Sequence, residues 1–166
     1  MITLVLGGSR SGKSAVAERL ALAAEGPVLY LATGWSDPGD DDMDERIARH
    51  RAGRSPRFET IETGRDLVAA LLDRPDQPAL VDALGTWVAA HDDFEVPIDA
   101  LVVSLLARSA PTVVTSDEVG LGVHPETRVG RRFRDALGIV NQRVAAVATT
   151  TYLVVAGRAI ELGAAP

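Results

Sequence analysis

The sequence predicts an α/β fold, in which a mostly parallel sheet carries helices on both faces. Short runs of strand length, rich in β-branched residues or leucine, recur along the chain. Each run is separated from the next by a stretch long enough for a crossover helix, the connection that parallel strands require. The runs lie at residues 2–6, 28–32, 78–83, 112–115 and 152–156.

The stretches between these runs have helical patterns. In the longest of them, apolar residues recur at positions 129, 133, 137, 140 and 144, in steps that place them on one face of a helix. Helices are therefore expected at 13–24, about 43–52, 65–73, 96–108 and 129–147.

Two further strands complete the predicted sheet. Residues 58–61 are a candidate for one of them. Residues 159–162 are expected to pair with 152–156 across Gly157 and Arg158, which would give a C-terminal β-hairpin.

The composition is that of one compact domain. The chain has 166 residues, of which 46% are hydrophobic, and a formal net charge of −6, so we expect a single domain over residues 1–166. The acidic balance and an aromatic content of 4% argue against a nucleic-acid-binding protein. There is no cysteine, no basic leader and no apolar run of about eighteen residues, so we expect a cytoplasmic protein without a membrane span.

The stretch LVLGGSRSGKSAVAERL carries the clearest chemical motif. Gly7, Gly12, Lys13 and Ser14 satisfy G-x-x-x-x-G-K-[ST] between a predicted strand and a predicted helix, which is the context that a P-loop requires. In such a loop the backbone amides bind phosphate, the lysine contacts the β and γ phosphates, and the serine binds Mg²⁺. Lys13 is the only lysine in the chain, so no neighbour could replace it. The alternative is an ordinary glycine-rich turn.

Acidic residues follow two of the predicted strands. Asp82 closes the run ALVD, where a carboxylate would lie at the carboxyl edge of the sheet, beside the phosphates and their metal. The alternative is a helix N-cap or a turn residue before Leu84 and Gly85. Asp117 and Glu118 directly follow another predicted strand, so the same edge is expected to carry at least three acids.

The stretch MDERIARHRAGR gathers four arginines around one histidine. Arg46, Arg49 and His50 share one face of a predicted helix, because they are spaced at i, i+3 and i+4. One interpretation is a solvated helix whose charges only suit its macrodipole. The other is that the arginines bind phosphates and His50 acts on them as a nucleophile or proton carrier.

Several motifs together resemble one enzyme family. GGSRSGKS, YLATG, RIARHRAGR, SDEVGLGVHPE, RRFRDALGIVNQRVA and LVVAGRAIEL occur in this order over nearly the whole chain. They are similar to the bifunctional adenosylcobinamide kinase / adenosylcobinamide-phosphate guanylyltransferase of cobalamin biosynthesis. The resemblance implies a P-loop NTPase domain related to the RecA type, assembled as a homotrimer. It also implies two reactions: phosphorylation of the aminopropanol hydroxyl of adenosylcobinamide by ATP or GTP, then transfer of GMP from GTP to adenosylcobinamide phosphate.

The motifs and the resemblance also imply roles for individual residues. His50 would take GMP covalently from GTP, and Arg46, Arg49, Arg51 and Arg54 would stabilise the charge that develops. Lys13 is the second expected catalytic residue, and Ser14 and Asp82 are the expected Mg²⁺ ligands. The expected nucleotide contacts are Gly7, Gly8, Ser9, Arg10, Ser11, Gly12, Lys13, Ser14, Ala32, Thr33, Gly34, Arg49, Arg51, Glu62 and Asp82.

The chain departs from the family pattern in three places. Asp117 stands where an asparagine is expected, Ile139 stands where an arginine is expected, and segment 87–95 is shorter and more acidic. His91 and His124 are expected to be surface or structural residues.

Two other functions remain as alternatives. One is a P-loop small-molecule kinase in which His50 is idle. The other is a nucleotide-dependent assembly module that hydrolyses nucleotide without transferring any group.

Overall fold

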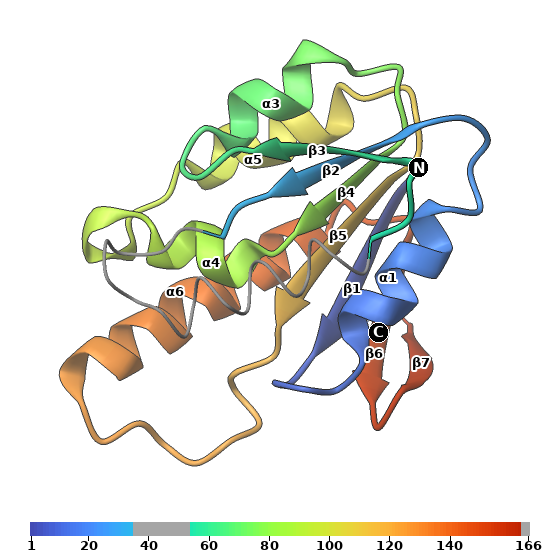
Figure 1. The fold of residues 1–166 in the computed structure, drawn as a ribbon. Coiled ribbons are helices and arrows are strands. Elements are labelled where there is room, and N and C mark those ends of the chain that lie inside the picture. Colours follow the sequence, from blue (N-terminus) through green and yellow to red (C-terminus); the bar gives the residue numbers. More distant parts are fainter. Residues whose placement is uncertain (35–53, 164–166) are drawn as a thin grey trace.

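The computed structural model describes residues 1–34 and 54–163, in which strands and helices alternate along the chain (Figure 1). Within these ranges one mostly parallel sheet carries helices on its faces, which confirms the predicted α/β class. The helix expected at about 43–52 lies outside the described residues.

Seven strands of the described residues form one sheet, in the order β3-β2-β4-β5-β1-β6-β7. Neighbouring strands are parallel except for the last pair, in which β7 runs antiparallel to β6. The carboxyl ends of the parallel strands therefore meet at one edge, which is where open α/β sheets bind ligands. The strands are β1 Ile2–Gly7, β2 Val28–Ala32, β3 Phe58–Glu62, β4 Ala79–Asp82, β5 Thr112–Asp117, β6 Thr150–Val155 and β7 Arg158–Leu162.

The described helices cover the two faces of the sheet unequally (Figure 1). One face is covered by α1, which packs against β1, β4 and β5. The opposite face is covered by the other four α-helices, which share a larger core with the sheet. The helices are α1 Lys13–Ala21, α3 Leu67–Asp73, α4 Leu84–Ala89, α5 Ile98–Leu106 and α6 Arg128–Ala145, with a 3₁₀ turn at Asp92–Phe94.

Alternate residues of each central strand belong to different cores, which explains why the strand sequences are apolar without interruption. Leu4 and Leu6 of β1 pack in the larger core, whereas Val5 between them packs with α1. In β2, Leu31 packs in the larger core and Tyr30 in the smaller one.

The C-terminal hairpin is confirmed, but its turn lies one residue earlier than the sequence predicts. Val155 pairs with Arg158, so the two-residue loop consists of Ala156 and Gly157 rather than Gly157 and Arg158. Both loop residues have positive φ, +50° and +75°, as a type I′ turn requires. Glycine adopts positive φ without strain, which explains why Gly157 lies within the turn.

The sequence patterns do not predict α4. It has six residues, too few to show a helical period, and it is held by the burial of Leu84, Trp87 and Val88. Its N-cap residue is Ala83, so the alternative role of Asp82 as a helix cap is wrong. Asp82 is instead the last residue of β4, at the carboxyl edge of the sheet.

The first helix ends earlier than its sequence pattern. The expected helix at 13–24 stops at Ala21. Beyond it, the guanidinium of Arg57 donates hydrogen bonds to the carbonyl oxygens of Leu22, Ala24 and Gly26. These carbonyls are thus held by a residue that lies next to β3, a long-range contact that a helical pattern cannot reveal.

Candidate functional site

The segment between β1 and α1 is a tight loop that depends on its glycines. Gly12 has a φ of +92°, in the left-handed region that other residues rarely adopt. A Cβ atom on Gly7 would lie 2.4 Å from the Oγ of Ser11, so no side chain fits there. The Ser11 N–H donates to the carbonyl oxygen of Gly8 at 3.2 Å, and the Lys13 N–H donates to Ser11 Oγ at 3.3 Å. This closed turn directly before a helix is the geometry of an anion-binding loop.

The turn of the C-terminal hairpin packs against the same loop. The backbone N–H of Gly157 donates to the carbonyl oxygen of Ser11 at 2.7 Å. A Cβ atom on Gly12 would lie 3.1 Å from the Cα of Gly157. The hairpin therefore supports the loop, a contact that the sequence patterns do not predict.

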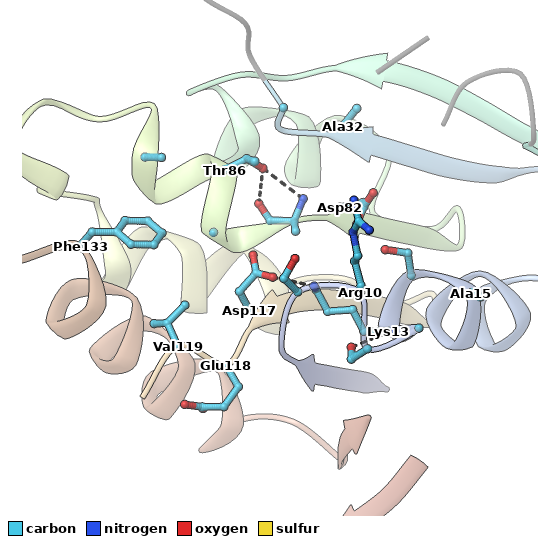
Figure 2. Close-up of a pocket in the computed structure, with 18 of the residues that line it drawn as sticks. Arg10, Lys13, Ala15, Ala32, Asp82, Thr86, Asp117, Glu118, Val119 and Phe133 are labelled. Carbon is cyan, nitrogen blue, oxygen red and sulfur yellow. Dashed lines mark hydrogen bonds and ion pairs between the residues drawn. The ribbon is translucent and has the colours of Figure 1, made fainter. Parts of the chain in front are cut away.

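Lys13 forms an ion pair with Asp117 at the end of β5. Its Nζ lies 2.6 Å from Asp117 Oδ1 and also donates to the carbonyl oxygen of Gly8 at 3.3 Å. The Lys13 side chain is 12% exposed and that of Asp117 is 32% exposed, so the pair is partly shielded from water. Figure 2 shows the two side chains meeting in the pocket.

Asp82, at the end of the neighbouring strand β4, accepts hydrogen bonds on both of its carboxylate oxygens. Thr115 Oγ1 donates to Oδ1 at 2.8 Å, and the Tyr30 hydroxyl donates to Oδ2 at 2.5 Å. Burial, together with the negative charge of Asp82, raises the pKa of Tyr30 above its usual range. Tyr30 is therefore a neutral donor throughout the physiological pH range.

Arg54 packs over the ring of Tyr30, the residue whose hydroxyl donates to Asp82. Its guanidinium carbon is 3.7 Å from the centroid of the Tyr30 ring, which is a cation–π contact. Its Nη1 donates to Thr60 Oγ1 at 3.2 Å. Its Nε is buried, and within the described residues it has no hydrogen-bond partner.

These groups border a cavity of about 1000 Å³ at the carboxyl edge of the sheet. Arg10 and Ala15 lie on one side of it, and Val119 and Phe133 lie on the opposite side (Figure 2). The described residues that line the cavity are Ser9, Arg10, Ser11, Gly12, Lys13, Ser14, Ala15, Ala32, Gly34, Arg54, Glu62, Asp82, Ala83, Gly85, Thr86, Ala89, Asp117, Glu118, Val119 and Phe133.

Most of the predicted nucleotide contacts within the described residues line this cavity, but Thr33 does not. Thr33 is fully buried, and its Oγ1 donates to the carbonyl oxygen of Ala83 at 2.6 Å and lies 2.6 Å from Thr86 Oγ1. It fixes the start of α4 relative to β2. Gly7 and Gly8 also stand outside the cavity wall, where they shape the loop.

The predicted histidine site cannot be placed, because His50 and the arginines at 46, 49 and 51 lie outside the described residues. The other two histidines each contact another residue of the chain. His91 Nδ1 is 2.8 Å from the carbonyl oxygen of Trp87, and His124 Nδ1 is 2.8 Å from Arg134 Nη1.

Comparison with known proteins identifies the family. The family model described as cobinamide kinase / cobinamide phosphate guanyltransferase matches residues 3–162. The chain belongs to this family.

Relatives of similar length support the assignment. The chain is 36% identical to the bifunctional adenosylcobalamin biosynthesis protein CobU of Escherichia coli, over 98% of this chain and 99% of that protein. The identity and the coverage are the same for CobU of Salmonella typhimurium. The bifunctional adenosylcobalamin biosynthesis protein CobP of Pseudomonas aeruginosa is also 36% identical, over 100% of this chain and 99% of that protein.

Among solved structures, the P4 protein from bacteriophage phi6 in complex with ADP matches with a TM-score of 0.48 and 16% identity. The match covers 99% of this chain and spans 58% of that protein.

Among the helices of the described ranges, none combines the length and the apolar character needed to cross a membrane.

Three oxygen-bearing side chains at the carboxyl edge of the sheet have the chemistry that a magnesium ion prefers. Ser14 begins α1, and the carboxylates of Asp82 and Asp117 end the neighbouring strands β4 and β5. Mg²⁺ prefers oxygen ligands and is commonly bound by one or two carboxylates together with substrate phosphates. In residues 1–34 and 54–163, no group of three or more His, Cys, Asp or Glu is placed to hold a metal by itself.

Sequence reasoning missed several residues that shape the site. Tyr30 and Thr115 both donate to Asp82, although each lies inside an apolar strand and gives no local signal. Thr86 and Phe133 line the cavity from α4 and α6. Phe133 belongs to the predicted apolar stripe of its helix, so only the packing of that helix shows that it also borders the cavity.

Proposed function

We propose that this member of the family phosphorylates adenosylcobinamide with a nucleoside triphosphate and then transfers GMP from GTP to the product through His50. The observation that carries the proposal is the cavity in which Lys13 and two strand-terminal carboxylates, Asp82 and Asp117, surround a glycine-dependent loop. The match to the family over residues 3–162 supports the identity of the acceptor.

In the first step, the loop would hold the triphosphate and Lys13 would contact its β and γ phosphates. The aminopropanol hydroxyl oxygen attacks the γ phosphorus, the bond from that phosphorus to the departing nucleoside diphosphate breaks, and the hydroxyl proton is lost. Lys13 and Arg10 can stabilise the negative charge on the transferred phosphoryl group, because both line the cavity. A Mg²⁺ ion held by Ser14 and a carboxylate would neutralise further phosphate charge.

In the second step, an imidazole nitrogen of His50 would attack the α phosphorus of GTP and pyrophosphate would leave. A phosphate oxygen of adenosylcobinamide phosphate would then attack the same phosphorus and release His50, which gives adenosylcobinamide-GDP. Covalent capture divides one difficult transfer into two displacements. The sequence places Arg49 and Arg51 beside His50, and Arg54 lines the cavity.

The acceptor would enter from the side of the cavity opposite Arg10. Val119 and Phe133 give that side an apolar wall (Figure 2), and Ala89 of α4 also lines the cavity. A large organic acceptor buries apolar surface against such residues, whereas its reacting oxygen must lie near Lys13.

The test is to label the protein with GTP that carries a radioactive α phosphate, in the presence of Mg²⁺, and to measure acid-labile label after denaturation. We expect label on the wild type and on His124→Ala, and none on His50→Ala. His124→Ala is the matched control, because it removes an exposed imidazole elsewhere in the chain.

Two results would change the proposal. Label on His50→Ala at the wild-type level would show that another residue accepts GMP. No label on any of the three proteins, with GTP binding intact, would favour a P-loop kinase without transferase activity.

The resemblance also leads us to propose a homotrimer of single-domain chains in the cytoplasm. The sheet supports one domain, because β1 near the start of the chain lies between β5 and β6. Sedimentation of the purified protein would test the trimer.

A further inference from the structure

The pairing of Lys13 with Asp117 creates a conflict in the nucleotide site. The distance from Lys13 Nζ to Asp117 Oδ1 is 2.6 Å. The carboxylate is therefore paired with the same ammonium group that would contact the phosphates. A triphosphate bound to Lys13 would bring its negative oxygens next to this carboxylate. Like charges at such a distance repel strongly in a partly shielded site.

Asp117 is held in place on several sides, so its backbone cannot simply withdraw. Its residue pairs with Gly7 in the β1–β5 ladder, and the amide of Asn141 donates to its carbonyl oxygen at 3.1 Å. Its Oδ2 lies above Gly85, where a Cβ atom would be only 2.5 Å away. The absence of a side chain at Gly85 therefore leaves space for this carboxylate at the end of β5.

The described cavity wall has no surplus of positive charge to resolve the conflict. Its charged residues are three basic and four acidic, namely Arg10, Lys13, Arg54, Glu62, Asp82, Asp117 and Glu118. A bound triphosphate adds several negative charges. A cation that arrives with the nucleotide is the simplest compensation for the carboxylate that loses Lys13.

Asp82 is less suited than Asp117 to exchange partners. Both of its carboxylate oxygens already accept hydrogen bonds from neutral donors, Tyr30 and Thr115, which a phosphate does not displace. Asp117, in contrast, depends on a cation that the phosphates also require.

We propose that Asp117 exchanges partners on nucleotide binding: it gives up Lys13 to the phosphates and binds the divalent cation that accompanies them. This inference rests on the proposed function, because it assumes that the loop binds a triphosphate. Its consequence is that Asp117 makes nucleotide binding depend on Mg²⁺, since without the cation the carboxylate repels the phosphates.

The test compares the GTP dissociation constants of the wild type and Asp117→Asn by calorimetry, in excess Mg²⁺ and in EDTA. The quantity of interest is the ratio of the EDTA value to the Mg²⁺ value. We expect Asp117→Asn to lower this ratio about tenfold or more, because it removes both the repulsion in EDTA and the ligand in Mg²⁺. Glu118→Gln is the matched control, since it removes one negative charge from the next residue, whose side chain extends away from Lys13 (Figure 2). We expect it to keep the wild-type ratio.

An unchanged ratio in Asp117→Asn would overturn the inference, and so would an equal fall in Glu118→Gln. Binding of GTP by the wild type in Mg²⁺ would leave the proposed function standing in either case. If the wild type bound no GTP in either buffer, the proposed function would itself fail, and the inference with it.

A second measurement does not require Asp117→Asn to fold. Binding of Mn²⁺ without nucleotide, followed by electron paramagnetic resonance, should be tighter in Lys13→Met than in the wild type, because Asp117 then lacks its cation. Equal Mn²⁺ affinities in the two proteins would overturn the exchange of partners.

Discussion

The two faces of the sheet have different tasks, although both are covered by buried side chains. Within residues 1–34 and 54–163, the core beneath α3 to α6 contains 18 buried residues and the core beneath α1 contains 10. The smaller core includes Tyr30, whose hydroxyl reaches Asp82 and whose ring lies beneath Arg54. Among the described residues the larger core therefore contributes more of the hydrophobic stabilisation, whereas the smaller one contains the side chain that donates to Asp82.

This division teaches that stability and chemistry are separable in this fold. Substitutions beneath α3 and α5 should lower the free energy of unfolding without a selective effect on nucleotide binding. Substitutions of the polar site residues on the α1 side should lower nucleotide binding with little change in the free energy of unfolding.

The largest expected effect is that of Lys13→Ala on the α1 side. Loss of the ammonium should lower nucleotide-dependent phosphorylation of cobinamide about 10³-fold, because no other lysine exists to contact the phosphates. The melting temperature should change little, since the pair with Asp117 is partly solvated. Phosphoryl transfer from γ-labelled nucleotide measures the first effect and thermal unfolding the second.

Arg19→Ala is the matched control for Lys13→Ala. It removes an exposed cation from the same helix, and transfer should stay near the wild-type rate. If Lys13→Ala unfolded at a much lower temperature than Arg19→Ala, the α1 side would have a larger part in stability than its core suggests.

The next largest effect is expected in the larger core. Leu71→Ala should lower the free energy of unfolding by about 3 kcal/mol, because Leu71 is fully buried and its truncation leaves a cavity. Its neighbour Leu72 is 48% exposed, so Leu72→Ala should lower the free energy of unfolding by less than about 1 kcal/mol. Urea denaturation measures both. GTP affinity of the folded proteins should be equal, and a selective loss in Leu71→Ala would contradict the division between the faces.

Local sequence patterns were sufficient to predict the sheet and the phosphate-binding loop. The central strands are apolar on both faces, and the loop motif is contiguous, so both leave a signal within a few residues. The pattern failed at α4, which is too short to show a period, and at the hairpin turn, where Ala156 rather than Arg158 adopts positive φ.

The contacts of the site could not be predicted in the same way, because they join residues far apart in the sequence. Asp82 was expected at the carboxyl edge from its position after a strand, and the structure places it there. Its donors Tyr30 and Thr115 come from two other strands, and which strands are neighbours is decided by the packing of the whole sheet. The ion pair of Lys13 with Asp117 has the same origin, since β1 and β5 are adjacent only in the folded chain.

The smallest expected effect is that of Tyr30→Phe, and it tests the division most sharply. The substitution removes only the hydrogen bond to Asp82 and keeps the ring that packs in the smaller core and beneath Arg54. Without this hydrogen bond Asp82 is held less firmly, and we expect GTP to bind about fivefold more weakly with Mg²⁺, which corresponds to about 1 kcal/mol. Tyr152→Phe on β6 is the matched control and should leave that affinity unchanged. Equal GTP affinities of Tyr30→Phe and the wild type, together with a lower unfolding free energy, would mean that Tyr30 serves the core alone. A selective loss of affinity would instead show that the smaller core sets the position of Asp82 in the site.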